Sequence, residues 1–326
     1  MDIAGPPRRR LMLGSILGLT MAKTAGAQTQ WPNRAIRFIN PGPAGGSGDV
    51  VARIVMEHVG ATLGQPVVID NRPGAGTNIG MAAVAQSQAD GYTIGLGSIA
   101  ANAVNKWIYP NLPFDPERDF AAVSMLVLMP NIMVVPPRLP VRNLAEFIAW
   151  CRANAPISFG SVGAGSSQHL AGAQFGLATG VEMQHVPYTN SGQLNTDLME
   201  GRTQVLFQSV SAVAEMVRAG AMRALAVTGI ERVSVFPHLP TLKESGVDIT
   251  STGWFGVVAP AAVSASILDM LQKAVVTALA DESVKQKLIG LGAVPRGSTR
   301  EEFQRFMEAE TLKYRDIIKA SGASAN

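Results

Sequence analysis

The sequence predicts an α/β protein whose core is a largely parallel sheet. Short apolar segments of strand length alternate with segments of helical period along most of the chain. Glycine-rich turns repeatedly stand where a strand would pass into a helix. The 326 residues, 47% of them apolar, suffice for a large buried core and suggest two domains. This composition excludes an intrinsically disordered chain.

The first strand and helix pairs are predicted between residues 36 and 98. Residues 36–41 form an apolar strand, and apolar positions 50, 51, 54, 55, 59 and 63 have the period of a helix that ends at Gly64. The order then repeats with a strand over 67–70, a helix over 79–88 and a strand over 93–98.

A second series follows Met129-Pro130. Strands are predicted at 131–135, 157–160, 183–187, 204–208 and 223–228, and helices at 144–154, 168–179, 193–200 and 212–219. A strand over 254–259 precedes helices at 266–280, 282–291 and 300–320. Thr299 and Glu302 have the spacing of a capping box at the start of the last helix.

The N-terminus has the pattern of a signal peptide. Arg8, Arg9 and Arg10 precede an apolar stretch over 11–21, and Ala25-Gly26-Ala27 has small residues at the cleavage positions. We expect cleavage after Ala27 and export to the periplasm, by the general or the twin-arginine route. A short N-terminal anchor helix is the alternative. No later segment reaches 18 uninterrupted apolar residues, so we expect a soluble mature protein.

The net charge of +3 lies entirely in residues 1–27, and residues 28–326 contain 23 charges of each sign. A nucleic-acid partner is not expected, because such proteins keep a basic surface in their folded part. The single cysteine, Cys151, excludes an intrachain disulfide and is expected to be a buried structural thiol.

Three glycine-rich loops, at residues 42–49, 72–80 and 160–168, each lie between a predicted strand and a predicted helix. Glycine lets backbone N–H groups turn inward, and the helix start behind each loop adds unpaired donors and positive potential. Such loops favour an anion site that needs no lysine or arginine. Glycine can also stand there simply to turn the chain.

Nucleotide, metal and cofactor sites are not expected. Residues 74–80 read G-x-G-x-x-x-G, which departs from the dinucleotide motif, and no Walker A or G-x-S-x-G sequence occurs. The four histidines, His58, His169, His185 and His238, show no metal-ligand spacing. We expect His169 and His185 to serve packing and hydrogen bonding.

Neutral polar residues gather where predicted strands end, and their donors suit carboxylate and hydroxyl groups. Gly45 and Gly46 would let a ligand approach the backbone closely. The polar residues are Ser47, Ser98, Asn102, Ser166, Ser167, Tyr188, Asn190 and Ser209.

Several of these segments resemble the Bug family, also called TctC-like, the extracytoplasmic solute receptors of tripartite tricarboxylate transporters. The matching stretches include PGPAGGSGDVVAR (41–53), DNRPGAGTNIG (70–80), SFGSVGAGSSQHLAG (158–172), HVPY (185–188) and PHLPTLKESG (237–246). The resemblance implies a type II periplasmic-binding fold, in which two α/β domains flank a ligand cleft and are joined by two crossover strands. The crossovers are placed near 131–135 and 254–258. The domains would then be residues 28–130 plus 254–326, and residues 131–253.

The resemblance also implies where a ligand carboxylate binds. First-domain loops would hold it, and the second domain would close over it. The matching residues are Gly45, Gly46, Ser47, Ser98, Asn102, Gly165, Ser166, Ser167, Tyr188 and Asn190. Asp49 is expected to cap the following helix rather than to touch the ligand. The family usually has a basic residue after HVPY where this chain has Thr189, so a strongly anionic tricarboxylate is disfavoured.

The predicted function is therefore capture of a small organic carboxylate by hinge closure, without catalysis. The partners would be membrane subunits of a transporter, or a sensor kinase, and the receptor would be a monomer. The family often has Phe and Thr where this chain has Gly42 and Gly48, which predicts room for a bulkier monocarboxylate. An exported serine hydrolase that uses Ser166 or Ser167 is the alternative.

Overall fold

The computed structural model describes residues 1–3, 5, 31–188 and 191–321. The chain comprises two units, Met1–Trp31 and Pro32–Asn326, and the second contains all the secondary structure discussed below. Most of the predicted signal peptide lies outside the described residues. In the part of the chain that is described, no helix is both long and apolar enough to cross a membrane.

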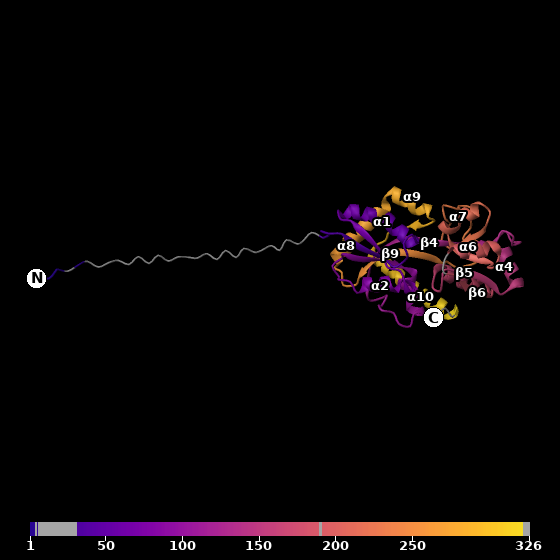
Figure 1. Cartoon of the computed structure of the whole chain (residues 1–326), viewed down its shortest axis with the longest axis horizontal. Helices are drawn as coiled ribbons and strands as arrows, with labels where there is room; N and C mark the ends of the chain where they lie inside the picture. The colour runs from indigo at the N-terminus through magenta and orange to yellow at the C-terminus, as the bar shows by residue number, and fades with distance from the viewer. Residues whose placement is uncertain (4, 6–30, 189–190, 322–326) are drawn as a thin grey trace. The chain divides into compact units, whose positions relative to one another are not determined.

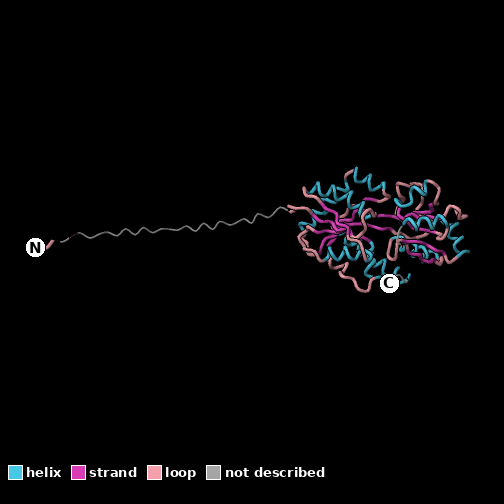
Figure 2. Tube along the Cα trace, in the orientation of Figure 1, coloured by secondary structure: helices cyan, strands magenta, loops and turns pink. Residues whose placement is uncertain are grey.

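The second unit is an α/β fold, as the sequence predicts, with helices around the central strands (Figures 1 and 2). Ten strands are described, and eight of them follow the order β2-β1-β3-β9-β4-β7-β5-β6, while β8 and β10 also pair with β4. Pairs within β1–β3 and within β5–β7 are parallel, whereas β4 and β9 run antiparallel to their neighbours. The strands are β1 Ile36–Asn40, β2 Val67–Asn71, β3 Thr93–Ser98, β4 Phe120–Val135, β5 Ile157–Ser161, β6 Met183–Pro187, β7 Val205–Ser209, β8 Arg223–Val227, β9 Thr252–Pro260 and β10 Val294–Pro295.

Strand β4 differs from the prediction, which placed a strand over 131–135 only. It spans 16 residues and includes Pro130, which has no N–H to donate. The proline is tolerated because β4 changes partners there: Phe120–Pro130 pairs with β9, and Asn131–Val134 pairs with β7. One strand thus hydrogen-bonds to both parts of the sheet.

The described helices agree with the predicted ones to within a few residues at most ends. The prediction missed a turn of π-helix over Ala100–Val104 and the short helix that follows it. The helices are α1 Ser47–Leu63, α2 Asn78–Ala85, α3 Asn105–Ile108, α4 Leu144–Asn154, α5 Ser167–Thr179, α6 Ser191–Glu200, α7 Val210–Arg218, α8 Ala265–Ala280, α9 Glu282–Gly290 and α10 Arg300–Ser321.

The start of α10 confirms the capping box. Glu302 N donates to Thr299 Oγ1 over 3.1 Å, and Thr299 N donates to Glu302 Oε2 over 2.9 Å. The two side chains thereby satisfy backbone donors that the first helical turn leaves unpaired.

The C-terminal helices pack on helix α1 and strand β4 from earlier in the unit. Helices α8 and α9 contact α1, although more than 200 residues separate them in sequence (Figure 1). Helix α10 buries Phe303 and Tyr314 in one apolar cluster with Trp254 of β9, and the Trp254 and Phe303 rings meet edge to face at 5.6 Å. The division into two domains stays a prediction.

Separate apolar clusters fill the part of the unit built from β5–β8. One surrounds Phe147, Phe175 and Phe207 and includes Cys151. Cys151 has no exposed surface, as predicted, and burial raises the pKa of its thiol to about 12. The thiol is therefore neutral at physiological pH and acts as a small apolar core residue.

Replacing Phe303 with alanine should lower the free energy of unfolding by about 3–5 kcal/mol, because a buried ring on Trp254 would be lost. Urea unfolding followed by circular dichroism would measure the change. Leu312→Ala on the same helix is the control, since Leu312 is exposed and should change stability by less than about 0.5 kcal/mol. Equal losses in the two variants would contradict the packing described for α10.

Candidate functional site

A cavity of about 660 Å³ lies where the two parts of the sheet meet through β4 and β9. Its walls come from segments far apart in sequence. The β1–α1 loop and Ser98 at the end of β3 form one wall, and Gln208, Ser209 and the first turn of α7 form the other. Met129 of β4 and Phe255 of β9 also line it. The size is within the range of small-molecule binding sites.

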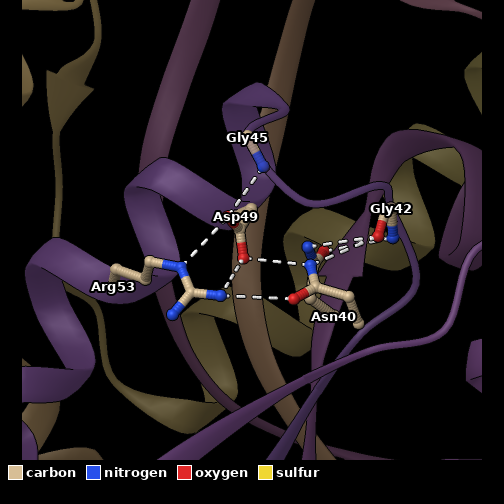
Figure 3. Close-up of polar contacts among 6 residues, drawn as sticks. Asn40, Gly42, Gly45, Asp49 and Arg53 are labelled. Carbon is tan, nitrogen blue, oxygen red and sulfur yellow. Dashed lines mark hydrogen bonds and ion pairs between the residues drawn. The ribbon is translucent and has the colours of Figure 1, made fainter.

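The β1–α1 loop is held by side chains of the strand and the helix that it joins (Figure 3). Asn40 Oδ1 accepts the N–H of Gly42 over 3.1 Å, and Asp49 Oδ2 accepts the N–H of Gly45 over 2.9 Å. Gly45 has a φ of 75°, a conformation that glycine adopts without strain. The loop is therefore preorganised before any ligand binds.

Asp49 is the charged group at the centre of this arrangement (Figure 3). Arg53 Nε donates to Asp49 Oδ2 over 3.0 Å, and Asn71 Nδ2 donates to Asp49 Oδ1 over 2.9 Å. Burial by itself would raise the pKa of Asp49, but the hydrogen bonds from Arg53, Gly45 and Asn71 outweigh it and lower the pKa to about 2. The carboxylate lines the cavity, and its bond to Gly45 holds the loop ahead of α1. Asp49 was predicted to cap this helix, but it lies within the first turn, and the N-cap, Gly46, has no side-chain cap bond.

The surroundings of Gly48 limit the extra room for a ligand that the sequence predicts in this loop. A Cβ at this position would lie 2.8 Å from Leu96 Cδ2 and 3.4 Å from an atom of the Phe255 ring. The space beside Gly48 is therefore occupied by two cavity-lining side chains rather than left open to a ligand. A side chain at position 48 would require Leu96 to shift.

The opposite wall contains two glutamines that the sequence analysis missed. Gln208 is buried, and its Oε1 accepts hydrogen bonds from Gln168 Nε2 over 3.1 Å and from Ser209 N over 3.0 Å. Both glutamines line the cavity. The rule that nominated Ser209, a polar residue at the end of a strand, applies equally to Gln208. Gln168 follows a glycine-rich loop in the first turn of α5.

The structure brings together five of the predicted site residues: Gly45, Gly46, Ser47, Ser98 and Ser209 all line the cavity. Asn102 does not line it, although its Oδ1 accepts the N–H of Ser98 over 3.1 Å. Asn102 therefore supports a lining residue from behind. Asn190 lies outside the described residues.

The loop over 160–168 places its predicted residues differently. Val162 and Gln168 line the cavity, whereas Gly165, Ser166 and Ser167 do not. Ser166 is the N-cap of α5, where its Oγ accepts the N–H of His169 over 3.3 Å and donates to Gly163 O over 2.7 Å. The His169 imidazole accepts from Gly165 N instead. No base activates Ser166 in this arrangement, so the geometry does not support the serine hydrolase.

Tyr188 also points away from the cavity. Its hydroxyl donates to Asp197 Oδ2 on α6 over 2.8 Å. Burial, together with the neighbouring Asp197 carboxylate, raises the pKa of Tyr188 to about 12. The phenol is thus a neutral donor engaged within the β6–α6 region.

The loop over 72–80 contributes little to the cavity. Among its residues, Thr77 lines the wall. Thr77 has a φ of 87°, and Asn105 Nδ2 donates to Gly76 O over 2.7 Å, so this loop is fixed by the turn that follows β3. All three glycine-rich loops thus contribute to the lining, and the β1–α1 loop contributes most of the residues.

The cavity is nearly neutral, yet helix starts surround it. Asp49 is the one charged residue among the described residues that line it. First-turn residues of four helices are part of the lining: Ser47 of α1, Gln168 of α5, Ser191 of α6 and Ser211 of α7. Helix N-termini contribute unpaired N–H groups and positive potential. The arrangement can bind an anionic group without a basic side chain.

One face of the cavity is apolar, with Leu96, Met129, Phe255 and Leu291 in its lining. Across residues 31–188 and 191–321, no group of three or more His, Cys, Asp or Glu side chains could hold a metal ion. The lining can accommodate a small molecule that has an anionic group and an apolar part.

Such a cleft, in a sheet crossed by two long antiparallel strands, defines the class of α/β solute-binding proteins. Residues 51–323 match the family described as "Tripartite tricarboxylate transporter family receptor". The chain belongs to this family, as the sequence motifs predict.

Similar proteins and solved structures support this family assignment. The chain is 34% identical to Protein BugT of Bordetella pertussis over 317 residues, which cover 95% of this chain and 97% of that protein. The structure of R. palustris Rpa4515 with adipate superposes with a TM-score of 0.81 at 34% identity, over 90% of this chain and 99% of that one. The periplasmic binding protein BugD gives a TM-score of 0.77 at 29% identity, over 91% and 100% of the two chains.

The Asp49 carboxylate should make stability depend on pH. Its pKa is about 2 in the folded state against an ordinary 3.8, so its contribution is present above pH 3.8 and is lost as the pH falls towards 2. We expect Asp49→Asn to be about 2 kcal/mol less stable than the wild type at pH 6, with the gap closing below pH 3.8. Urea unfolding at several pH values would measure it.

Asp248→Asn is the matched control, because the Asp248 side chain is 85% exposed and pairs with Lys243 at the surface. It should change stability by less than about 0.5 kcal/mol at every pH. A gap between Asp49→Asn and the wild type that does not depend on pH would refute the role given to the Asp49 carboxylate.

Proposed function

We propose that this chain is an exported receptor that captures a small organic carboxylate in the cavity between β4, β9 and the β1–α1 loop. The observation on which this rests is the cavity of about 660 Å³ with four helix starts and neutral donors in its lining. The R. palustris relative with adipate, at 34% identity, supports a carboxylate as the ligand.

The ligand carboxylate would lie at the β1–α1 loop. Ser47 and Ser98 would donate to it, and the backbone at Gly45 and Gly46 would approach it closely. Ser209 of the opposite wall would bind a second polar group, and Gln168 and Gln208 extend this wall. Asn102 would act indirectly through Ser98.

The remaining predicted residues would act when the cleft closes. We infer two domains, residues 28–130 plus 254–326 and residues 131–253, that move about β4 and β9. The partner change of β4 at Pro130 supports a hinge at this point. Closure would bring Gly165, Ser166, Ser167, Tyr188 and Asn190 nearer to the ligand. A ligand favours the closed state by its higher affinity for that state.

The chemistry of the lining favours ligands with one or two carboxylates and an apolar part. Leu96 and Phe255 would pack on a carbon chain or ring, since burying apolar surface favours binding. A tricarboxylate would leave charges without a cation, because no basic side chain is among the described lining residues.

The receptor would work in the periplasm after removal of residues 1–27. The leader pattern and the likeness to the periplasmic binding protein BugD support this location. The partners would be the membrane subunits of a tripartite transporter, which the family name suggests, or a sensor kinase. We propose a monomeric receptor without a nucleic-acid partner, cofactor or catalytic activity.

A thermal-shift panel would test the ligand class. The panel holds adipate, hexanoate, benzoate, succinate and citrate, with adipamide as an uncharged match for adipate. We expect a saturable rise in Tm with at least one mono- or dicarboxylate, because a ligand at 100 times its Kd adds about 2.7 kcal/mol of stability. Adipamide and citrate should give smaller rises in Tm.

The protein is denatured and refolded before the panel, so that a molecule retained in the cleft is removed and can be identified. Saturable binding of citrate above all the other acids would overturn the preference argued from the neutral lining. No shift with any acid, and no acid released on denaturation, would overturn the carboxylate receptor itself.

Removing single donors from the cleft should weaken binding without affecting folding. Each neutral hydrogen bond is worth about 1 kcal/mol, so Ser209→Ala and Gln168→Ala should each raise the Kd about fivefold. Titration calorimetry with the acid found in the panel measures this. Ser264→Ala is the control, because Ser264 is exposed at the start of α8 and does not line the cavity. Unchanged Kd values in both cleft variants would place the ligand elsewhere.

A further inference from the structure

Two histidines stack beneath the glycine-rich loop over residues 161–166. His169 lies in the first turn of α5 and His185 in β6, and their ring centroids are 4.0 Å apart with planes 25° from parallel. Phe159 of β5 packs on both rings, at 5.1 Å from His185 and 6.1 Å from His169. His169 is buried and His185 partly buried.

Each imidazole is bonded to one end of the loop. Gly165 N donates to His169 Nδ1 over 3.2 Å. His185 Nε2 lies 2.7 Å from Ser161 Oγ. The same Oγ accepts the N–H of Gly163 over 3.1 Å and donates to Gly163 O over 3.0 Å, so Nε2 is the donor to Ser161. Val162, between these anchored positions, lines the ligand cavity. The rings therefore fix a segment of the cleft wall without lining the cleft themselves.

The bond to Gly165 requires a neutral His169. A backbone N–H can only donate, so Nδ1 must be the unprotonated nitrogen of the ring. Protonation would turn Nδ1 into a second donor that faces the first. Protonating the second ring as well would place two positive charges in a stack only 4.0 Å apart.

No described group is placed to compensate such a charge. The neighbours from β5, α5 and the start of β6 include Phe159, Ala173 and Met183, and the charged side chain among them, Glu182, is exposed. On the other side of the loop, Gly165 packs against Ile108 and Val104. A proton on either ring would therefore enter mostly apolar surroundings.

We propose that His169, with His185 stacked on it, is a positioning residue for the loop over 161–166, so that protonation of His169 Nδ1 releases the loop and weakens ligand retention in acid. The consequence for the ligand rests on the proposed function, whereas the effect on the loop does not. A receptor of this kind would hold its ligand at neutral pH and release it as the medium becomes acidic.

The direction of the pH dependence follows from the surroundings of the rings. Burial lowers the pKa of His169, and burial and then the neighbouring His169 lower the pKa of His185 from 6.5 to about 4. The released loop would leave the rings nearer to an ordinary pKa. The held state is thus favoured above about pH 6.5 and loses stability as the pH falls below that value.

Hydrogen exchange measured by mass spectrometry tests the loop directly, without any ligand. Protection of peptides covering residues 161–166 is compared at pH 7 and pH 4.5 after correction for the intrinsic exchange rate. In the wild type we expect protection to fall between tenfold and about a hundredfold, while peptides from β4 and β9 stay protected.

Variants at position 169 separate a positioning role from simple packing. His169→Asn places an amide oxygen where Nδ1 stands, so it should keep the acceptor for Gly165 and remain protected at both pH values. His169→Leu fills the space without an acceptor and should lose protection of the loop already at pH 7. Equal, pH-independent protection in the wild type, His169→Asn and His169→Leu would overturn the proposal.

Binding of adipate, measured by calorimetry at pH 7 and pH 4.5, tests the consequence for the ligand. The double variant H169N/H185Q has neither titrating ring, so its change in Kd reports the protonation of adipate alone. We expect the wild-type Kd to rise about tenfold more than that of the double variant. Equal rises in Kd for the wild type and the double variant would overturn the link between the histidines and ligand retention. A failure of adipate to bind at any pH would count against the proposed ligand class and leave the exchange result to decide the role of the histidines.

Discussion

The antiparallel pairing of β4 with β9 is the constraint on which the rest of the structure depends. It runs from Phe120–Pro130 on one strand to Thr252–Pro260 on the other. Strand β3 joins through β9, and β7 and β8 join through β4. The two strands thus form the link between the parallel groups β1–β3 and β5–β7. The geometry of the cavity between these groups is set by the same two strands.

The C-terminal helix connects this pair of strands to the first wall of the cavity. Helix α10 packs on β4 and on Trp254 of β9. From the same helix, Thr311 Oγ1 donates to Asn102 O over 3.1 Å, and Asn102 Oδ1 accepts the N–H of Ser98. A cavity-lining residue is therefore held through buried contacts by a helix more than 200 residues away in sequence. Substitutions on the buried face of α10 can alter the cleft without touching a ligand.

Much of the fold could be predicted because its signals are local. Helical periods, capping residues and apolar strands lie within short windows of sequence, and the capping box at Thr299 and Glu302 was found for this reason. The full length of β4 could not be found in the same way. Pro130 reads locally as the end of a strand, and it is tolerated only because β4 changes partners there, which is a property of the sheet. The π-helical turn over Ala100–Val104 likewise has no simple local signature.

The candidate site was predictable to a similar degree. Glycine-rich turns and strand ends identified Gly45, Ser47, Ser98 and Ser209, because the ends of parallel strands meet at one edge of a sheet. The directions of individual side chains were not predictable. Tyr188 turns to Asp197, and Ser166 caps α5. These side-chain orientations depend on tertiary neighbours that short windows of sequence do not contain.

The neutrality of the cavity follows from how this fold supplies positive potential. A lysine or arginine in the cleft would lose hydration when the cleft closes over an anion, at a cost in free energy. Helix starts such as those at Ser47 and Ser211 present fixed N–H groups that are already oriented, so binding requires little reorganisation. The affinity for an anion then depends on how firmly the loops before these helix starts are held in place. The Asp49 carboxylate holds one loop, and the stacked pair of His169 and His185 holds the other. The Asp49 carboxylate stays charged down to about pH 2, whereas the His169 ring must stay neutral. The loop over 161–166 should therefore be released at a higher pH than the β1–α1 loop.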